Sequence, residues 1–163
     1  MARGYAVILM GSGADLERGR AIQGHLAEHF GVAARLRIAS AHKTPRELLE
    51  LLEGLEADPA PKVYVTVAGR ANALSGLVDA QVAAPVIACP PYAEAFAGAD
   101  LFSSLRMPSG VAPLVVLEPE GAALAAAKLL ALADPEVRAR VRAYQAASRE
   151  RVRAADRALE EGA

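Results

Sequence analysis

The chain has 163 residues, of which 53% are hydrophobic and only 4% aromatic, and its formal net charge is −1. This length suits one domain, and the composition allows a core of Ala, Val and Leu, whereas the near-zero charge offers no overall basic field to hold nucleic acid. No apolar stretch approaches the roughly 20 residues of a membrane-spanning helix. The single cysteine, Cys89, cannot form an internal disulfide, so we expect a reducing, cytoplasmic setting.

Short apolar runs alternate with segments of helical periodicity along the chain. The first run, at residues 5–10, ends at glycine and is typical of a strand buried on both faces. Thr44 and Pro45 open a later helix as its N-cap and first helical residue. In chain order we predict strands at 5–10, 33–39, 62–68, 85–89 and 113–117, helices at 15–30, from 45, 72–82, 121–132 and 135–161, and a loop with helical turns at 90–110.

This alternation predicts an α/β fold, in which a five-stranded parallel sheet lies between two helical layers as a three-layer αβα sandwich of the flavodoxin-like type. We expect a single domain over 1–163, with its α/β core at 1–134 and a long C-terminal helix at 135–161. Ligands of such sheets bind at the carboxyl ends of the strands, where the strand order reverses. The loops that follow the strands are therefore the place to look for chemistry.

Three of these loops carry polar residues that should meet at one rim. They read GSGAD at 11–15, SAHKTP at 40–45 and GRAN at 69–72. In the first, backbone N–H groups and the Ser12 hydroxyl at a helix start suit a phosphate, although an ordinary turn capped by Asp15 would have the same sequence.

The second and third loops supply a proton carrier and two cations. His42 lies at a strand end, and an imidazole exchanges a proton near neutral pH; the alternative is a loop histidine with a local hydrogen bond. Lys43 and Arg70 are suited to hold a phosphate or carboxylate, unless they are merely solvated charges.

The remaining candidates favour structural interpretations. His25 and His29 have i, i+4 spacing, but no carboxylate or cysteine pattern accompanies them, so we interpret them as a polar helix face and expect no metal. Cys89 is expected to be a buried small hydrophobe rather than a nucleophile. Ser109 lies between Pro and Gly in a loop that could cover a site.

Together the motifs resemble the aminoimidazole ribonucleotide carboxylase family, in order and from about residue 7 to 132. They are GSGAD, SAHKTP, AGRAN, PVIACPP at 85–91, SSLRMPSG at 103–110 and LEPEGAA at 117–123. In one branch of the family, the mutases, the second loop is similar to SAHRTP and the third loop carries a His. These enzymes rearrange N5-carboxyaminoimidazole ribonucleotide. This chain has Lys43, Arg70, Asn72 and Cys89-Pro90-Pro91, with Ala73 at the place of that His, and so resembles the branch that uses carbon dioxide directly.

The resemblance implies a carboxy-lyase of purine (IMP) biosynthesis, a phosphoribosylaminoimidazole carboxylase that acts on 5-aminoimidazole ribonucleotide and carbon dioxide without a cofactor. It implies His42 as the proton carrier. It also implies substrate contacts at Ser12, Asp15, Ser40, Ala41, Lys43, Gly69, Arg70, Ala71 and Ser109. Many relatives have Ser at the place of Ala14, so one hydroxyl is missing from the first loop. The mutase reaction and a non-catalytic nucleotide-binding module stay open as alternatives.

The last helix indicates assembly. Val137, Val141 and Tyr144 begin an apolar stripe, which Val152 and Leu159 extend among alternating Arg and Glu. At 1.5 Å per residue the helix is about 40 Å long, which is longer than the sheet of a small domain. The apolar stripe on its far half therefore needs a partner outside its own domain, unless this half is a solvated tail. The resemblance implies a compact homo-oligomer, commonly an octamer.

Overall fold

In the computed structural model, which describes residues 3–162, five parallel strands form one sheet in the order β2-β1-β3-β4-β5. The strands are β1 (Tyr5–Met10), β2 (Ala33–Ile38), β3 (Lys62–Val67), β4 (Val86–Ala88) and β5 (Leu114–Val115). This order is that of flavodoxin-like folds and reverses between β1 and β3. The expected sheet is confirmed, but β5 is shorter than the predicted 113–117.

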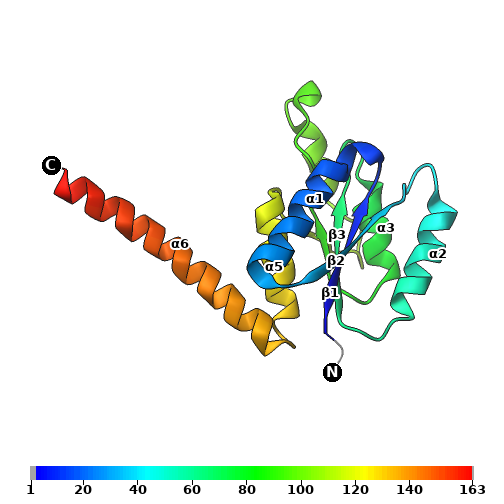
Figure 1. Cartoon of the computed structure of the whole chain (residues 1–163). Helices are drawn as coiled ribbons and strands as arrows, with labels where there is room; N and C mark the ends of the chain where they lie inside the picture. Colours follow the sequence, from blue (N-terminus) through cyan, green and yellow to red (C-terminus); the bar gives the residue numbers. More distant parts are fainter. Residues whose placement is uncertain (1–2, 163) are drawn as a thin grey trace.

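Helices cover both faces of the sheet (Figure 1). They are α1 (Leu16–His25) and α5 (Pro119–Leu130) on one face, and α2 (Pro45–Glu56) and α3 (Ala73–Gln81) on the other. Side chains alternate along a strand, so Ile8 of β1 packs under α1 and α5 while Val7 and Leu9 pack under α2 and α3. The three-layer sandwich is thereby confirmed. Helix α5 begins two residues earlier than predicted because Pro119 takes its first turn.

The helix predicted at 15–30 is interrupted at both ends. A 3₁₀ turn at Gly13–Asp15 precedes α1, and a π-helical turn at Leu26–Phe30 follows it. Leu26 and Phe30 are both buried in that wide turn, and the Phe30 ring lies 5.2 Å from the ring of Tyr144. Gly31 ends the turn in the left-handed conformation, with φ of 63°.

We expect Gly31→Ala to lower the free energy of unfolding by about 1 kcal/mol or more, because a Cβ is unfavourable at positive φ. The new Cβ would also lie 3.1 Å from the Arg140 guanidinium carbon. Gly24→Ala is the matched control, since no atom lies within 4 Å of its Cβ position, and helix propensity should make that variant more stable. Chemical denaturation measures both, and a Gly31 variant as stable as the parent would contradict the argument.

Residues 90–110 form a projecting segment beyond the carboxyl ends of the strands (Figure 1). As predicted, the segment has helical turns, at Glu94–Phe96, Ala99–Leu101 and α4 (Phe102–Leu105). Left-handed residues Ala97 and Gly98 reverse the chain between the first two turns. The reversal brings the later turn back towards the loop that follows β3.

Helix α6 (Pro135–Glu161) confirms the predicted last helix and leaves the body of the molecule (Figure 1). The Asp134 side chain caps it by accepting hydrogen bonds from the N–H groups of Glu136 and Val137. Its only fully buried residues among those described are Val137 and Val141, and every residue from 149 to 161 is exposed. The chain exposes 9371 Å², against about 7,700 Å² for a compact protein of its mass.

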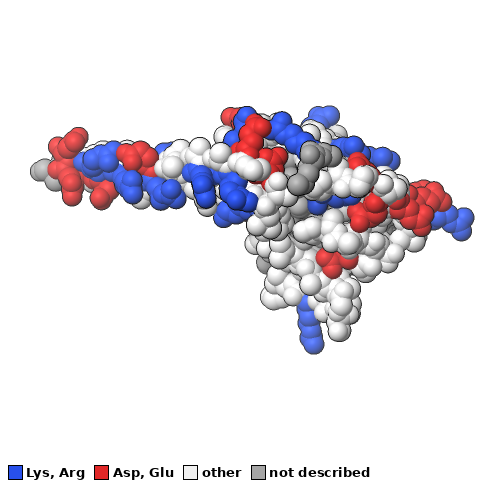
Figure 2. Space-filling view, turned by 90° about the horizontal axis from the view of Figure 1, so that it is seen from below, with Lys and Arg blue, Asp and Glu red and all other residues white. Residues whose placement is uncertain are grey.

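None of the helices within residues 3–162 is both long and apolar enough to cross a membrane. Helix α6 has the length, but Arg and Glu side chains are interspersed along it (Figure 2).

Candidate active site

A cleft of about 640 Å³ lies at the carboxyl ends of β1, β2 and β3, where the strand order reverses. All the residues predicted for the site line it except Ser109, which lies exposed in the turn before β5. The residues that line the cleft are Gly11, Ser12, Ala14, Asp15, Ser40, Ala41, His42, Lys43, Ala68, Gly69, Arg70, Ala71, Leu74, Pro91, Ala93 and Asp100. The convergence of the three loops therefore follows from the sheet, as expected.

The turn after β1 is held by Asp15. Its Oδ2 accepts hydrogen bonds from both the N–H and the hydroxyl of Ser12, each 3.0 Å long. The N–H of Gly11 meanwhile donates to the carbonyl of Val67 and ties this turn to β3. A phosphate at this helix start would thus compete with Asp15 for the Ser12 hydroxyl.

The turn after β2 presents His42 and Lys43 at its tip, where both are exposed. Thr44 holds the N-cap position of α2 and Pro45 its first helical position, as predicted, although the Thr44 hydroxyl makes no capping bond. It accepts from the N–H of Ser40 at 2.9 Å and donates to the Ser40 carbonyl at 3.3 Å. The Ser40 hydroxyl accepts from the N–H of Lys43. The hydroxyls therefore tighten the turn, which leaves the imidazole of His42 accessible from the cleft.

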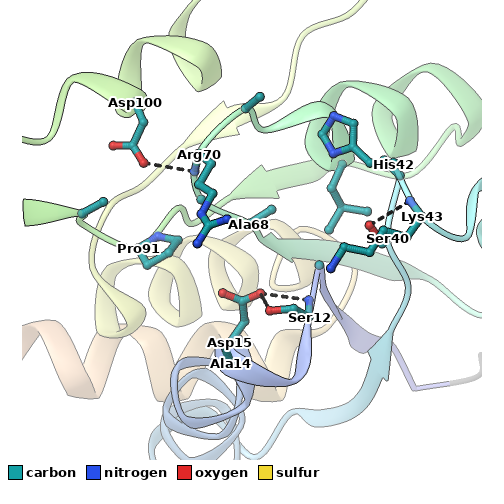
Figure 3. A pocket seen from close by; sticks show the side chains of 16 residues that line it. Ser12, Ala14, Asp15, Ser40, His42, Lys43, Ala68, Arg70, Pro91 and Asp100 are labelled. Atoms are coloured by element: carbon teal, nitrogen blue, oxygen red, sulfur yellow. Dashed lines mark hydrogen bonds between the residues drawn. The ribbon is translucent and has the colours of Figure 1, made fainter. Parts of the chain in front are cut away.

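The turn after β3 is shaped by the projecting segment. Arg70 has a left-handed backbone, with φ of 57°, and its N–H donates to Asp100 Oδ2 at 3.0 Å. A Cβ on Gly69 would lie 3.1 Å from Cγ of Pro91, so the proline packs directly over the glycine. Figure 3 shows the Arg70 guanidinium pointing into the cleft towards Asp15, with His42 at the opposite end.

Sequence reasoning missed Asp100, Pro91 and Ala93 in this site. All three come from the segment at 90–110, which the sequence predicts only as a loop with helical turns. The sequence of the segment does not distinguish Asp100 from its other carboxylate, Glu94, because the contact of Asp100 with Arg70 spans 30 residues of chain.

The residues interpreted as structural lie elsewhere. His25 and His29 have ring centroids 5.2 Å apart and do not line the cleft, and His25 Nε2 lies 3.4 Å from a Glu120 carboxylate oxygen. Cys89 is fully buried, as expected, and burial raises the pKa of its thiol, so it is a poor nucleophile. Across residues 3–162, no cluster of three His, Cys, Asp or Glu residues could hold a metal ion.

A parallel α/β sheet with a cleft at its switch point, a helix start and two cations in that cleft, and an exposed histidine at the rim is typical of proteins that bind small anionic molecules. The chain belongs to the AIR carboxylase family, which it matches over residues 5–151.

Relatives support this placement along most of the chain. Phosphoribosylaminoimidazole carboxylase of Archaeoglobus fulgidus is 54% identical over 154 residues, or 94% of this chain and 84% of the relative. The mouse bifunctional phosphoribosylaminoimidazole carboxylase/phosphoribosylaminoimidazole succinocarboxamide synthetase is 42% identical over 137 residues, which are 84% of this chain but 32% of the mouse protein. The crystal structure of Treponema denticola PurE matches with a TM-score of 0.94 at 45% identity and covers 96% of this chain and 99% of its own.

Proposed function

We propose that this protein is a phosphoribosylaminoimidazole carboxylase, which adds carbon dioxide to C4 of 5-aminoimidazole ribonucleotide. The observation that carries the proposal is that one cleft brings together an exposed imidazole, two cations and the helix start that carries the Ser12 hydroxyl. The names of the relatives from Archaeoglobus and Treponema support it, since both are called phosphoribosylaminoimidazole carboxylase. The small-molecule substrates would be the ribonucleotide and carbon dioxide.

The proposed carboxylation needs only a base that removes a proton, which a side chain of the cleft can supply. The aminoimidazole ring is an enamine, so C4 attacks the carbon of carbon dioxide, and the displaced electron pair leaves a carboxylate. C4 then carries both the carboxylate and a hydrogen. Neutral His42 removes that hydrogen as a proton, and the C–H electrons restore the aromatic ring. In reverse, protonated His42 returns the proton to C4 and carbon dioxide departs.

The other loops would hold the nucleotide. In this proposal Ser12, Ser40 and Lys43 bind the phosphate, together with N–H groups of the helix start. Asp15 accepts from the ribose hydroxyls, and the turn at 69–71 borders the ring. Ala41 lines the cleft beside these residues. Ser109 stays a prediction, because it does not line the cleft of its own chain.

One assay separates the candidate functions. We expect purified protein to consume 5-aminoimidazole ribonucleotide with carbon dioxide or bicarbonate, without ATP or biotin, and to keep its activity after extensive chelation. Turnover of N5-carboxyaminoimidazole ribonucleotide alone would instead assign the mutase reaction, and nucleotide binding with neither turnover would assign a non-catalytic module. Activity lost to a chelator and restored by one metal would contradict the cofactor-free chemistry.

We propose further that the protein is a closed homo-oligomer and that α6 helps to build it. Val152 and Leu159 are 71% and 74% exposed on a helix that leaves the body of its own chain (Figure 1). Val152 follows Val141 by 11 residues, about three helical turns, and Leu159 follows Val152 by seven, about two turns, so the three side chains stay on one side of the helix. A second copy could bury it.

We expect a chain truncated after residue 133 to assemble less completely than the intact protein, because truncation removes α6. Light scattering on both chains measures this. An intact protein that is monomeric and fully active would contradict the assembly, whereas an oligomer unaffected by truncation would contradict only the role of α6.

A further inference from the structure

The backbone of Arg70 is held in a conformation that it would rarely adopt alone. Arg70 and Ala97 are the two non-glycine residues with positive φ within residues 3–162. A side chain makes this conformation unfavourable, so it persists only where the surroundings impose it, and such residues cluster at functional sites. Arg70 lines the cleft, which Ala97 does not.

Two residues of the projecting segment fix the peptide groups on both sides of Arg70. Asp100 Oδ2 accepts from the Arg70 N–H at 3.0 Å. The Ser103 hydroxyl oxygen lies 2.8 Å from the carbonyl oxygens of both Arg70 and Asp100, so its one proton is shared between these two acceptors. The same hydroxyl oxygen accepts from the N–H of Asn72 at 3.0 Å, and the Asn72 side chain caps α3. Asp100 and Ser103 thus form a clamp that joins the turn after β3 to the segment above it.

The clamp acts on the backbone and leaves the guanidinium to the cleft. Figure 3 shows the Asp100 carboxylate at the Arg70 N–H, while the guanidinium points the other way, into the cleft. Within the described chain, no Asp or Glu oxygen forms a salt bridge with Arg70. A planar guanidinium without an internal partner can bind a carboxylate by donating two parallel hydrogen bonds, one to each carboxylate oxygen.

We propose that Asp100 and Ser103 are positioning residues that hold Arg70 to bind the carboxylate on the carboxylated nucleotide. The proposal rests on the proposed function, in which substrate and product share the ribose phosphate and differ by this carboxylate. Lys43, in the separate turn after β2, serves the phosphate. Loss of the clamp should therefore weaken product binding and spare substrate binding.

The test is equilibrium binding of 5-aminoimidazole ribonucleotide and its 4-carboxy product by calorimetry, with every variant built on His42→Asn to suppress turnover. We expect Asp100→Ala to lower the product-to-substrate affinity ratio about tenfold, the scale of one charge-assisted contact. Asp100→Asn keeps an acceptor oxygen for the Arg70 N–H and should restore most of the ratio. Glu94→Ala removes an exposed carboxylate from the same segment and should leave the ratio unchanged.

A double-mutant cycle shows whether Asp100 acts through Arg70. On an Arg70→Ala background, we expect Asp100→Ala to have no further effect on the ratio. An equal loss of affinity for both nucleotides, or an unchanged ratio in a folded Asp100→Ala protein, would overturn the proposal. Absence of carboxylase activity in the unsubstituted protein, with His42 in place, would instead contradict the proposed function, so the two failures are distinguishable.

Discussion

His42→Asn should lower turnover about 10²–10⁴-fold, which is the usual contribution of a general acid–base group. In the proposed reaction the imidazole moves the C4 proton, because the two carboxylates that line the cleft are engaged elsewhere: Asp15 accepts from Ser12, and Asp100 accepts from the Arg70 N–H. Asparagine keeps a similar shape and hydrogen-bonding capacity but carries no exchangeable proton of suitable acidity. Nucleotide affinity should therefore change little.

The carboxylation and decarboxylation rates give an internal check on this result. A catalyst cannot alter the equilibrium constant, so kcat/KM should fall by the same factor in both directions, with single-turnover kinetics reporting the chemical step. His29→Asn is the matched control, because His29 lies outside the cleft and the variant should keep parental rates. A His42→Asn enzyme with near-parental turnover would remove His42 from the mechanism.

Lys43→Ala should raise KM for the ribonucleotide about 10–100-fold with a much smaller effect on kcat. The reason is that a contact to phosphate persists unchanged from ground state to transition state, so its loss weakens both alike. Steady-state kinetics measure the two constants separately.

A substrate without the phosphate identifies the partner of Lys43. With 5-aminoimidazole ribonucleoside, the Lys43→Ala and parent enzymes should have the same kcat/KM. Arg46→Ala removes an exposed positive charge from the first turn of α2, outside the cleft, and controls for the general electrostatic effect. If Lys43→Ala lowered kcat at unchanged KM, the lysine would belong with the reacting atoms rather than with the phosphate.

Local sequence patterns were sufficient to predict the parallel sheet and the polar residues in the loops that follow β1, β2 and β3. The buried run of β1 and the alternation of strands and helices were sufficient for a parallel sheet, because strands buried on both faces have few other solutions. A parallel sheet then brings the carboxyl ends of neighbouring strands to one edge, so the sequence alone predicts that Ser12, His42 and Arg70 lie together.

Local patterns were weaker where tertiary contacts compete with them. Thr44 has the sequence of a helix cap, yet its hydroxyl bonds to Ser40 because the tight turn offers those partners first. The helical pattern of 15–30 gave no sign of the π-helical turn at Leu26–Phe30, where both of these side chains are buried.

Only the tertiary structure decided which residues of the projecting segment line the cleft and how the backbone of Arg70 is held. The Asp100 and Ser103 contacts join residues 30 and 33 positions from Arg70, and no periodicity or motif spacing encodes such a pairing. Both depend on the reversal at Ala97 and Gly98, which returns the segment to the turn after β3. The sequence by itself thus determined which chemical groups line the rim, since strand ends must meet, whereas the left-handed backbone of Arg70 required the folded chain, since only distant residues can hold it.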